Sequence, residues 1–117
     1  MISVIIPAYN EEKRILPTLE KILAVMENQE EDYELLIVND GSRDKTKDVV
    51  LSLQNEKIKL LSYEENRGKG GAVKYGVERA CGEYIIFTDA DLPYPPENIL
   101  SAWEILSQSS DVVLGKR

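Results

Sequence analysis

The chain has 117 residues, 43% of them hydrophobic and 30% charged, which is the size of one ordinary domain. Its 14 basic residues against 21 acidic ones give a net charge of −7, which argues against general affinity for nucleic acid or acidic membranes. Histidine is absent and Cys81 is the only cysteine, which excludes His- or Cys-built zinc sites, Ser-His-Asp triads and an intramolecular disulfide. We expect Cys81 simply to pack, and any metal site to use oxygen ligands.

Five short apolar runs rich in β-branched residues predict five strands. They lie at residues 2–6, 35–38, 58–61, 84–87 and 112–114. Because both alternating faces of these runs are apolar, we expect strands that are covered on both sides, as in a parallel sheet.

Helices are predicted between the strands from apolar residues at helical spacing. The expected positions are 17–28, where Pro17 fits the first turn, then around 49–53, around 73–82, and a fourth opened by Pro95 and Pro96. This alternation predicts a three-layer α/β/α domain with a mostly parallel sheet. Five acidic residues between positions 27 and 34 are interpreted as a solvated loop.

Polar segments follow every predicted strand, where a sheet of this kind binds its ligands. They occupy residues 7–12, 39–42, 66–71, 89–91 and 115–117. The sequence therefore predicts a ligand site along the edge formed by the carboxyl ends of the strands.

Asp89 and Asp91 follow the fourth strand and are separated by Ala90. Two such carboxylates can share one Mg²⁺ or Mn²⁺ ion with the oxygens of a diphosphate. The alternative is that one aspartate caps the next helix and the other is solvated.

Residues 66–79 carry four basic side chains against one acidic, a local charge of +3 in an acidic chain. The segment opens a predicted helix, where free N–H groups favour an anion, and Gly68, Gly70 and Gly71 allow close approach of the backbone. The spacing matches neither a P-loop nor Gly-x-Gly-x-x-Gly, so an ordinary exposed loop is the alternative.

Three further residues have two interpretations each. Asp40 stands where doubly wound folds place an acid that holds a ribose or base, or it forms a turn with the Gly and Ser that follow it. Tyr9 stacks on a base or covers the end of the sheet. Glu11 is either a ligand contact or a charge at the start of the next helix.

Four ordered segments together resemble the motifs of family 2 glycosyltransferases with the GT-A fold. They are Val-Ile-Ile-Pro-Ala-Tyr-Asn-Glu at 4–11, Val-Asn-Asp-Gly-Ser at 38–42, Asn-Arg-Gly-Lys-Gly at 66–70 and Asp-Ala-Asp-Leu at 89–92. The chain is most similar to the polyprenyl and dolichyl phosphate glucosyl- and mannosyltransferases. Residues 111–117 resemble the Asp-Val-Val-x-Gly-Ser-Arg of these enzymes and depart from it at Lys116.

The resemblance implies that residues 1–117 form the N-terminal, nucleotide-sugar-binding part of such an enzyme. It implies a metal pair at Asp89 and Asp91, and a catalytic set of these two aspartates with Arg117, which lies near the sugar or acceptor phosphate. The implied nucleotide contacts are Pro7, Ala8, Tyr9, Glu11, Asp40, Lys69, Asp89 and Ala90.

The expected activity is inverting transfer of a hexose from a UDP- or GDP-sugar, with Mg²⁺ or Mn²⁺, to a polyprenyl or dolichyl phosphate or another glycan acceptor. The alternative is a non-catalytic nucleotide-sugar-binding module, because similar enzymes continue beyond this point with their acceptor half. A nucleotidyltransferase would need a glycine-rich basic loop after the first strand, which is absent from the sequence.

We expect a cytoplasmic protein, or one at the cytoplasmic face of a membrane that it contacts only through a lipid acceptor or further segments. An uncovered fifth strand would favour a homodimer.

Overall fold

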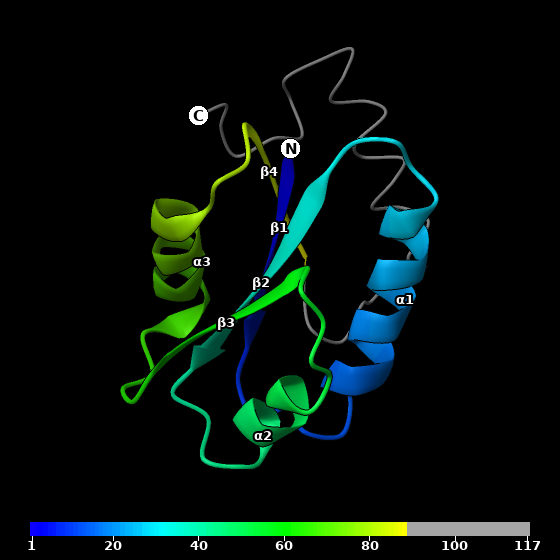
Figure 1. The fold of residues 1–117 in the computed structure, drawn as a ribbon. Helices are drawn as coiled ribbons and strands as arrows, with labels where there is room; N and C mark the ends of the chain where they lie inside the picture. Colours follow the sequence, from blue (N-terminus) through cyan, green and yellow to red (C-terminus); the bar gives the residue numbers. More distant parts are fainter. Residues whose placement is uncertain (89–117) are drawn as a thin grey trace.

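The computed structural model describes residues 1–88, which form four strands and three helices (Figure 1). The elements are β1 (Ile2–Ala8), α1 (Ile15–Glu27), β2 (Tyr33–Asp40), α2 (Thr46–Leu51), β3 (Ile58–Tyr63), α3 (Gly68–Arg79) and β4 (Tyr84–Phe87). The strands are parallel and lie in the order β3-β2-β1-β4, which confirms the predicted α/β fold. The predicted fifth strand and fourth helix lie outside the described residues.

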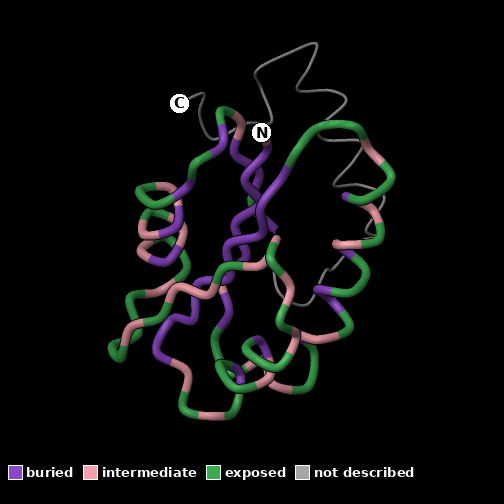
Figure 2. The backbone as a smooth tube through the Cα atoms, viewed as in Figure 1, coloured by how far each residue is buried: buried purple, intermediate pink, exposed green. Residues whose placement is uncertain are grey.

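The central strands β1 and β2 are covered on both faces, as their apolar runs predict, whereas the edge strand β3 exposes Lys59 and Ser62. In Figure 1, α3 lies on one side of the sheet and α1 on the other. Val4 and Ile6 pack into the cluster of α1, whereas Ile5 packs into the cluster of α3. Figure 2 shows the buried backbone concentrated in the strands between these layers.

Helix α1 buries one apolar stripe formed by Ile15, Leu19, Ile22 and Met26. It begins two residues before Pro17, so proline occupies its third position. Proline is tolerated there because the first four N–H groups of a helix have no partner within it. Among residues 1–88, no helix has the length and apolar character needed to cross a membrane.

Helix α3 lies close to the sheet because its contact face is made of small residues. Periodicity predicts Val73, Val77 and Ala80 as its apolar markers. Ala80 is buried just after the helix ends, but within the helix the buried residues are Ala72 and Gly76. A Cβ on Gly76 would lie only 2.8 Å from Cγ2 of Ile5. A glycine gives no hydrophobic signal in the sequence, so this contact could not be read from periodicity.

A buried carboxylate, Glu34, organises the edge of the sheet where β1 and β2 begin. Glu34 is 3% exposed, and it accepts hydrogen bonds from Ser3 Oγ at 2.6 Å, the Cys81 N–H at 2.7 Å and Lys59 Nζ at 2.7 Å. The Gly82 N–H donates to Ser3 Oγ at 2.8 Å, so the loop between α3 and β4 is fastened to β1 and β2.

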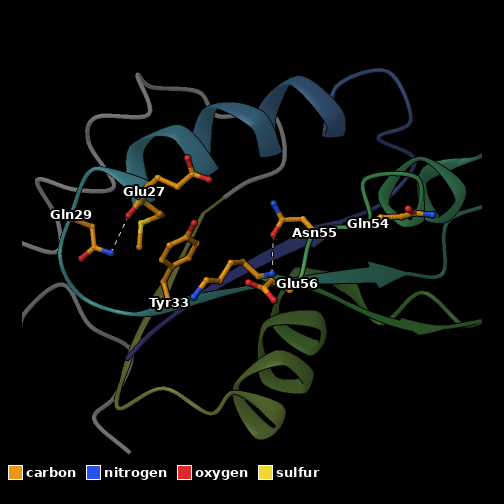
Figure 3. Close-up of a pocket in the computed structure, with 8 residues that line it drawn as sticks. Glu27, Gln29, Tyr33, Gln54, Asn55 and Glu56 are labelled. Carbon is orange, nitrogen blue, oxygen red and sulfur yellow. Dashed lines mark hydrogen bonds between the residues drawn. The ribbon is translucent and has the colours of Figure 1, made fainter.

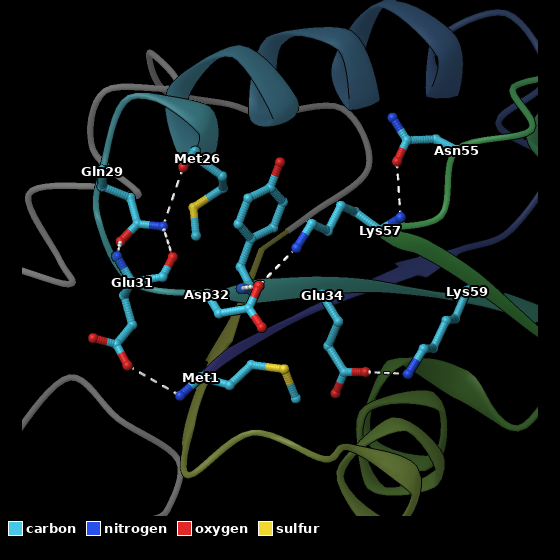
Figure 4. A network of polar contacts seen from close by, with 10 residues as sticks. Met1, Met26, Gln29, Glu31, Asp32, Glu34, Asn55, Lys57 and Lys59 are labelled. Atoms are coloured by element: carbon cyan, nitrogen blue, oxygen red, sulfur yellow. Dashed lines mark hydrogen bonds and ion pairs between the residues drawn. The ribbon is translucent and has the colours of Figure 1, made fainter.

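Two sequence expectations are wrong at this edge. Glu34 is not part of a solvated loop, because it lies inside β2 opposite Ser3. Cys81 does not pack but is exposed, whereas Ala80 and Gly82 on either side of it are buried. Figure 4 shows the pair of Glu34 and Lys59 beside the more exposed pair of Asp32 and Lys57.

The ionisation of Glu34 is coupled to this network. Burial alone would raise its pKa, but the hydrogen bonds from Lys59, Ser3 and the Cys81 N–H outweigh it and hold the pKa below its ordinary value of 4.5. The same contact raises the pKa of Lys59. A carboxyl group with a lowered pKa stabilises the fold above its ordinary pKa, and this contribution is lost as the pH falls through the folded-state value.

We expect Glu34→Gln to lower the free energy of unfolding at pH 7 by about 1–3 kcal/mol, because hydrogen bonds from buried donors lose a charged acceptor. The difference from wild type should shrink as the pH falls from 4.5 through the lowered folded-state pKa of Glu34, where the wild-type carboxylate is itself protonated. Urea unfolding at pH 7 and across this acidic range measures the difference. Glu30→Gln, at an exposed glutamate, is the control, and an equal loss in both variants would contradict the assignment.

Candidate functional site

The edge at which the sequence predicts a ligand lies where β1, β2 and β3 end side by side. In the sheet register Ala8 lies opposite Asn39, and Asp40 lies opposite Tyr63. Of the predicted contacts from β1, Ala8 is buried, Pro7 is partly buried and Tyr9 is exposed. The carboxyl ends of these strands therefore bring the segments after β1 and β2 to one edge.

The loops that follow β1 and β2 are tied together by hydrogen bonds. The Asn10 N–H donates to Ser42 Oγ at 3.0 Å, and the Arg43 N–H donates to Asn10 Oδ1 at 2.8 Å. The Glu11 N–H donates to Thr46 Oγ1 at 2.8 Å. Asn10 adopts a positive φ of 54°, which asparagine tolerates better than most residues. The two loops, residues 9–14 and 41–45, thus form one hydrogen-bonded surface at this edge, which we call the ledge.

Asp40 is the most strongly held side chain of this edge. It is 4% exposed, and its carboxylate accepts hydrogen bonds from the N–H groups of Arg67 at 2.8 Å and Gly68 at 3.1 Å and from the Tyr63 hydroxyl. The alternative that Asp40 closes its own turn is wrong, since it is Asn39 whose side chain accepts from the Ser42 N–H at 3.3 Å. Asp40 instead binds the N-terminus of α3, where a negative charge is favourable.

Gly41 is required by the close approach of two loops. Its φ is +69°, and a Cβ there would lie 2.6 Å from the backbone nitrogen of Asn66 and 2.8 Å from the carbonyl oxygen of Glu64. Asn66 Nδ2 also donates to the carbonyl oxygen of Asp40 at 3.1 Å. The segment after β3 is therefore packed against the end of β2.

The basic turn, residues 66–71, is brought to this same edge at the start of α3. Lys69 lies in the first turn of the helix and is exposed. The guanidinium of Arg67 lies 4.2 Å from the ring centroid of Tyr63, a cation–π distance. The structure thus brings the predicted residues Asp40 and Lys69 together, because Asp40 binds the backbone N–H groups of Arg67 and Gly68, which directly precede Lys69.

Glu11 has one paired and one unpaired carboxylate oxygen. Its Oε1 lies 2.5 Å from Arg14 Nη2, whereas Oε2 is buried and accepts no hydrogen bond within residues 1–88. The alternative that Glu11 is a first-turn charge is wrong, because α1 starts at Ile15 and has no acidic residue in its first turn. A buried acceptor without a donor is costly and commonly marks a place where a ligand or water binds.

The metal pair Asp89 and Asp91, with Ala90 and Arg117, lies outside the described residues. β4 runs parallel to β1 and ends at Phe87, opposite Ile5, three residues before the end of β1. In the described part of the chain, no group of three acidic or cysteine side chains could hold a metal ion.

A separate pocket of about 500 Å³ lies at the opposite edge of the sheet (Figure 3). Its lining includes Glu27, Gln29, Tyr33, Gln54, Asn55 and Glu56. Tyr33 begins β2 whereas Asp40 ends it, so this pocket belongs to neither the ledge nor the basic turn.

Sequence reasoning missed Tyr63 because it ended the third strand at residue 61. The strand continues to Tyr63, which places this side chain opposite Asp40. An acid-bearing segment such as 39–42 at the end of one strand could have prompted a search for donors at the end of its neighbour.

The comparisons with known proteins agree with this arrangement. The family described as "Glycosyl transferase family 2" matches residues 3–117. The chain belongs to this family.

Two solved structures and one curated relative illustrate the similarity. The chain is 43% identical over 99 residues to a dolichyl-phosphate beta-glucosyltransferase of Drosophila melanogaster, covering 77% of this chain and 30% of that protein. Staphylococcus aureus TarS in complex with UDP-GlcNAc matches with a TM-score of 0.74 and 31% identity over 92% of this chain and 31% of that one. The mannosyltransferase PcManGT of Pyrobaculum calidifontis, in complex with GDP-Man and Mn²⁺, matches with a TM-score of 0.68 and 28% identity. This match covers 91% of this chain and 32% of that one.

These neighbours are GT-A glycosyltransferases, which confirms the family and the fold that the motifs predict. The chain spans about a third of the length of the curated relatives it matches.

Gly41→Ala should lower the free energy of unfolding by more than about 1 kcal/mol, because a Cβ at positive φ would press on the backbone of residues 64–66. Gly70→Ala is the matched control, since a Cβ there meets nothing within 4 Å and lies in a helix. Alanine should leave stability unchanged or raise it by up to about 1 kcal/mol at that position. Thermal unfolding of both variants tests the close packing of Gly41 against residues 64–66. Equal changes in the stability of the two variants would contradict it.

Proposed function

We propose that this protein transfers a hexose from a UDP- or GDP-sugar to a polyprenyl or dolichyl phosphate. The observation that carries the proposal is the buried Asp40, fixed to the N-terminus of α3 beside the basic turn and the ledge. This edge offers a carboxylate for the nucleoside and a basic helix start for its phosphates, both in a chain of the glycosyltransferase family.

The donor nucleotide would lie along the edge with its base and ribose near Asp40, Tyr9 and Glu11. Asp40 and the unpaired Oε2 of Glu11 can accept hydrogen bonds from a base N–H or from ribose hydroxyls. Exposed Tyr9 offers an aromatic face to the base, while Pro7 and Ala8 supply the floor at the end of β1. TarS, with which the chain shares the fold, was solved with UDP-GlcNAc.

Lys69 would face the diphosphate, with Ala90 and the two flanking aspartates completing the contacts. Asp89 and Asp91 would hold Mg²⁺ or Mn²⁺, since paired carboxylates suit a hard cation and these two follow β4 directly in the sequence. The ion would neutralise charge on the leaving diphosphate. The presence of Mn²⁺ with GDP-Man in PcManGT supports this choice.

The proposed acceptor is a phosphate monoester. Its second pKa lies near 6, so it arrives largely ionised and needs no strong protein base, in keeping with a chain that lacks histidine. A phosphate oxygen would attack the anomeric carbon with inversion, while the bond to the nucleoside diphosphate breaks and the diphosphate keeps the electron pair. Arg117 would bind the sugar or the acceptor phosphate. The name of the dolichyl-phosphate relative supports this acceptor class.

Titration calorimetry with UDP and GDP, in Mn²⁺ and in excess EDTA, tests the donor and metal assignments together. We expect binding to tighten at least tenfold with Mn²⁺, because the ion offsets repulsion between the diphosphate and the two aspartates. Asp91→Asn should lose most of that gain, whereas Asp48→Asn, an exposed aspartate on α2, should keep it. Equal affinity in Mn²⁺ and EDTA would reject the metal site.

A transfer assay distinguishes the enzyme from a binding module. Incubation of the full chain with radiolabelled UDP-glucose or GDP-mannose and polyprenyl phosphate should give a labelled lipid. Donor binding without any lipid product would favour the alternative of a non-catalytic nucleotide-sugar-binding module.

A further inference from the structure

We propose that Tyr63 is a positioning residue whose hydroxyl holds the Asp40 carboxylate in the orientation that receives the donor nucleotide. The inference rests on the proposed function, because it takes Asp40 as a contact of the nucleotide. Tyr63 lies outside all four motif segments, at the end of β3, and its hydroxyl donates directly to Asp40.

The hydrogen bonds of Asp40 leave little freedom for the carboxylate. Oδ1 accepts from both the Tyr63 hydroxyl and the Arg67 N–H, while Oδ2 accepts, among residues 1–88, from the Gly68 N–H alone. A carboxylate has about four acceptor positions, so Oδ1 is filled and Oδ2 retains one. The nucleotide would donate to that position through a base N–H or a ribose hydroxyl.

The ring of Tyr63 is itself fixed on two sides. Arg67 lies over it at 4.2 Å, and the ring of Tyr75 meets it edge-on, with centroids 4.9 Å apart and an interplanar angle of 67°. The guanidinium of Arg79 lies 3.5 Å from the centroid of Tyr75 and extends the stack along α3. The hydroxyl is therefore presented to Asp40 by a packed ring and not by a freely rotating side chain.

The hydroxyl stays a donor over the working range of pH. Burial and the neighbouring Asp40 raise the pKa of Tyr63 well above its ordinary value of 10, so the phenol remains protonated. The Tyr63 hydroxyl accordingly remains available as a donor to Asp40 at neutral pH.

Tyr63→Phe tests the proposal, because it removes the hydroxyl and keeps the ring. We expect the Kd of the preferred nucleotide, UDP or GDP, to rise roughly five- to twentyfold, the effect of one hydrogen bond to a charged group. The preference between UDP and GDP should narrow as well, because Asp40 is no longer held in one orientation. Tyr75→Phe is the matched control and should change neither quantity by more than about twofold.

A double-mutant cycle separates positioning from general loosening of the fold. If Tyr63 acts through Asp40, adding Tyr63→Phe to Asp40→Asn should cost no further affinity, whereas independent effects would multiply. Urea unfolding of each variant confirms that the protein is folded at the temperature of the measurement.

Three results would overturn the proposal. Wild-type affinity and base preference in Tyr63→Phe would reject it while leaving the proposed function intact, and so would effects that multiply with those of Asp40→Asn. A wild-type protein that binds neither UDP nor GDP with Mn²⁺ would reject the proposed function and the inference together.

Discussion

The buried Asp40 carboxylate is the interaction on which the ligand edge depends. Burying a charge is costly unless polar donors surround it, and here three donors come from two places: the Tyr63 hydroxyl at the end of β3 and two successive N–H groups at the start of α3. One side chain thus joins the end of β2 to the end of β3 and to the basic turn. The position of Lys69 relative to the strands follows from this contact.

The backbone conformation of two residues, one in each of the loops after β1 and β2, makes this junction possible. Gly41 lets the segment 64–66 approach the end of β2 within a distance that excludes a side chain. Asn10 bends the chain after β1 so that its amide and side chain meet the loop after β2. The edge is therefore a set of loops whose backbones bind one another, and side chains such as Tyr9 project from it.

The sequence predicts the layers of this fold well and its contacts less well. Apolar runs identify all four described strands. The signal is strongest in β1 and β2, because a strand buried on both faces has little polar alternation, whereas β3 exposes Lys59 and Ser62. The close packing of α3 escapes the sequence because Gly76 has no side chain to count. Glu34 escapes it for a different reason: its charge suggests solvent, while its three donors are 25 or more residues away along the chain.

The predicted site shows the same division. The motifs identify Asp40, Glu11 and Lys69 as residues of one edge, since each follows a strand or opens a helix, and the structure places them there. Their partners are non-local: Tyr63 reaches Asp40 across 23 residues and Thr46 reaches the backbone of Glu11 across 35. A residue pattern indicates which groups a site contains, whereas only the register of the strands determines which donor meets which acceptor.

The two buried carboxylates of the sheet show why one edge is suited to a ligand and the other to stability. Glu34 and Asp40 each accept three hydrogen bonds, but one donor of Glu34 is the ammonium of Lys59, which neutralises its charge. The three donors of Asp40 are all uncharged, and the guanidinium of Arg67 lies on the ring of Tyr63. Asp40 therefore keeps the acceptor strength of a carboxylate at its remaining lone pair, because its charge is only partly offset by the helix N-terminus. Glu11 on the neighbouring ledge adds a second carboxylate oxygen that has no donor within residues 1–88. The edge where the strands end therefore retains hydrogen-bond acceptors for a ligand, whereas at the edge where the strands begin Glu34 is neutralised within the fold.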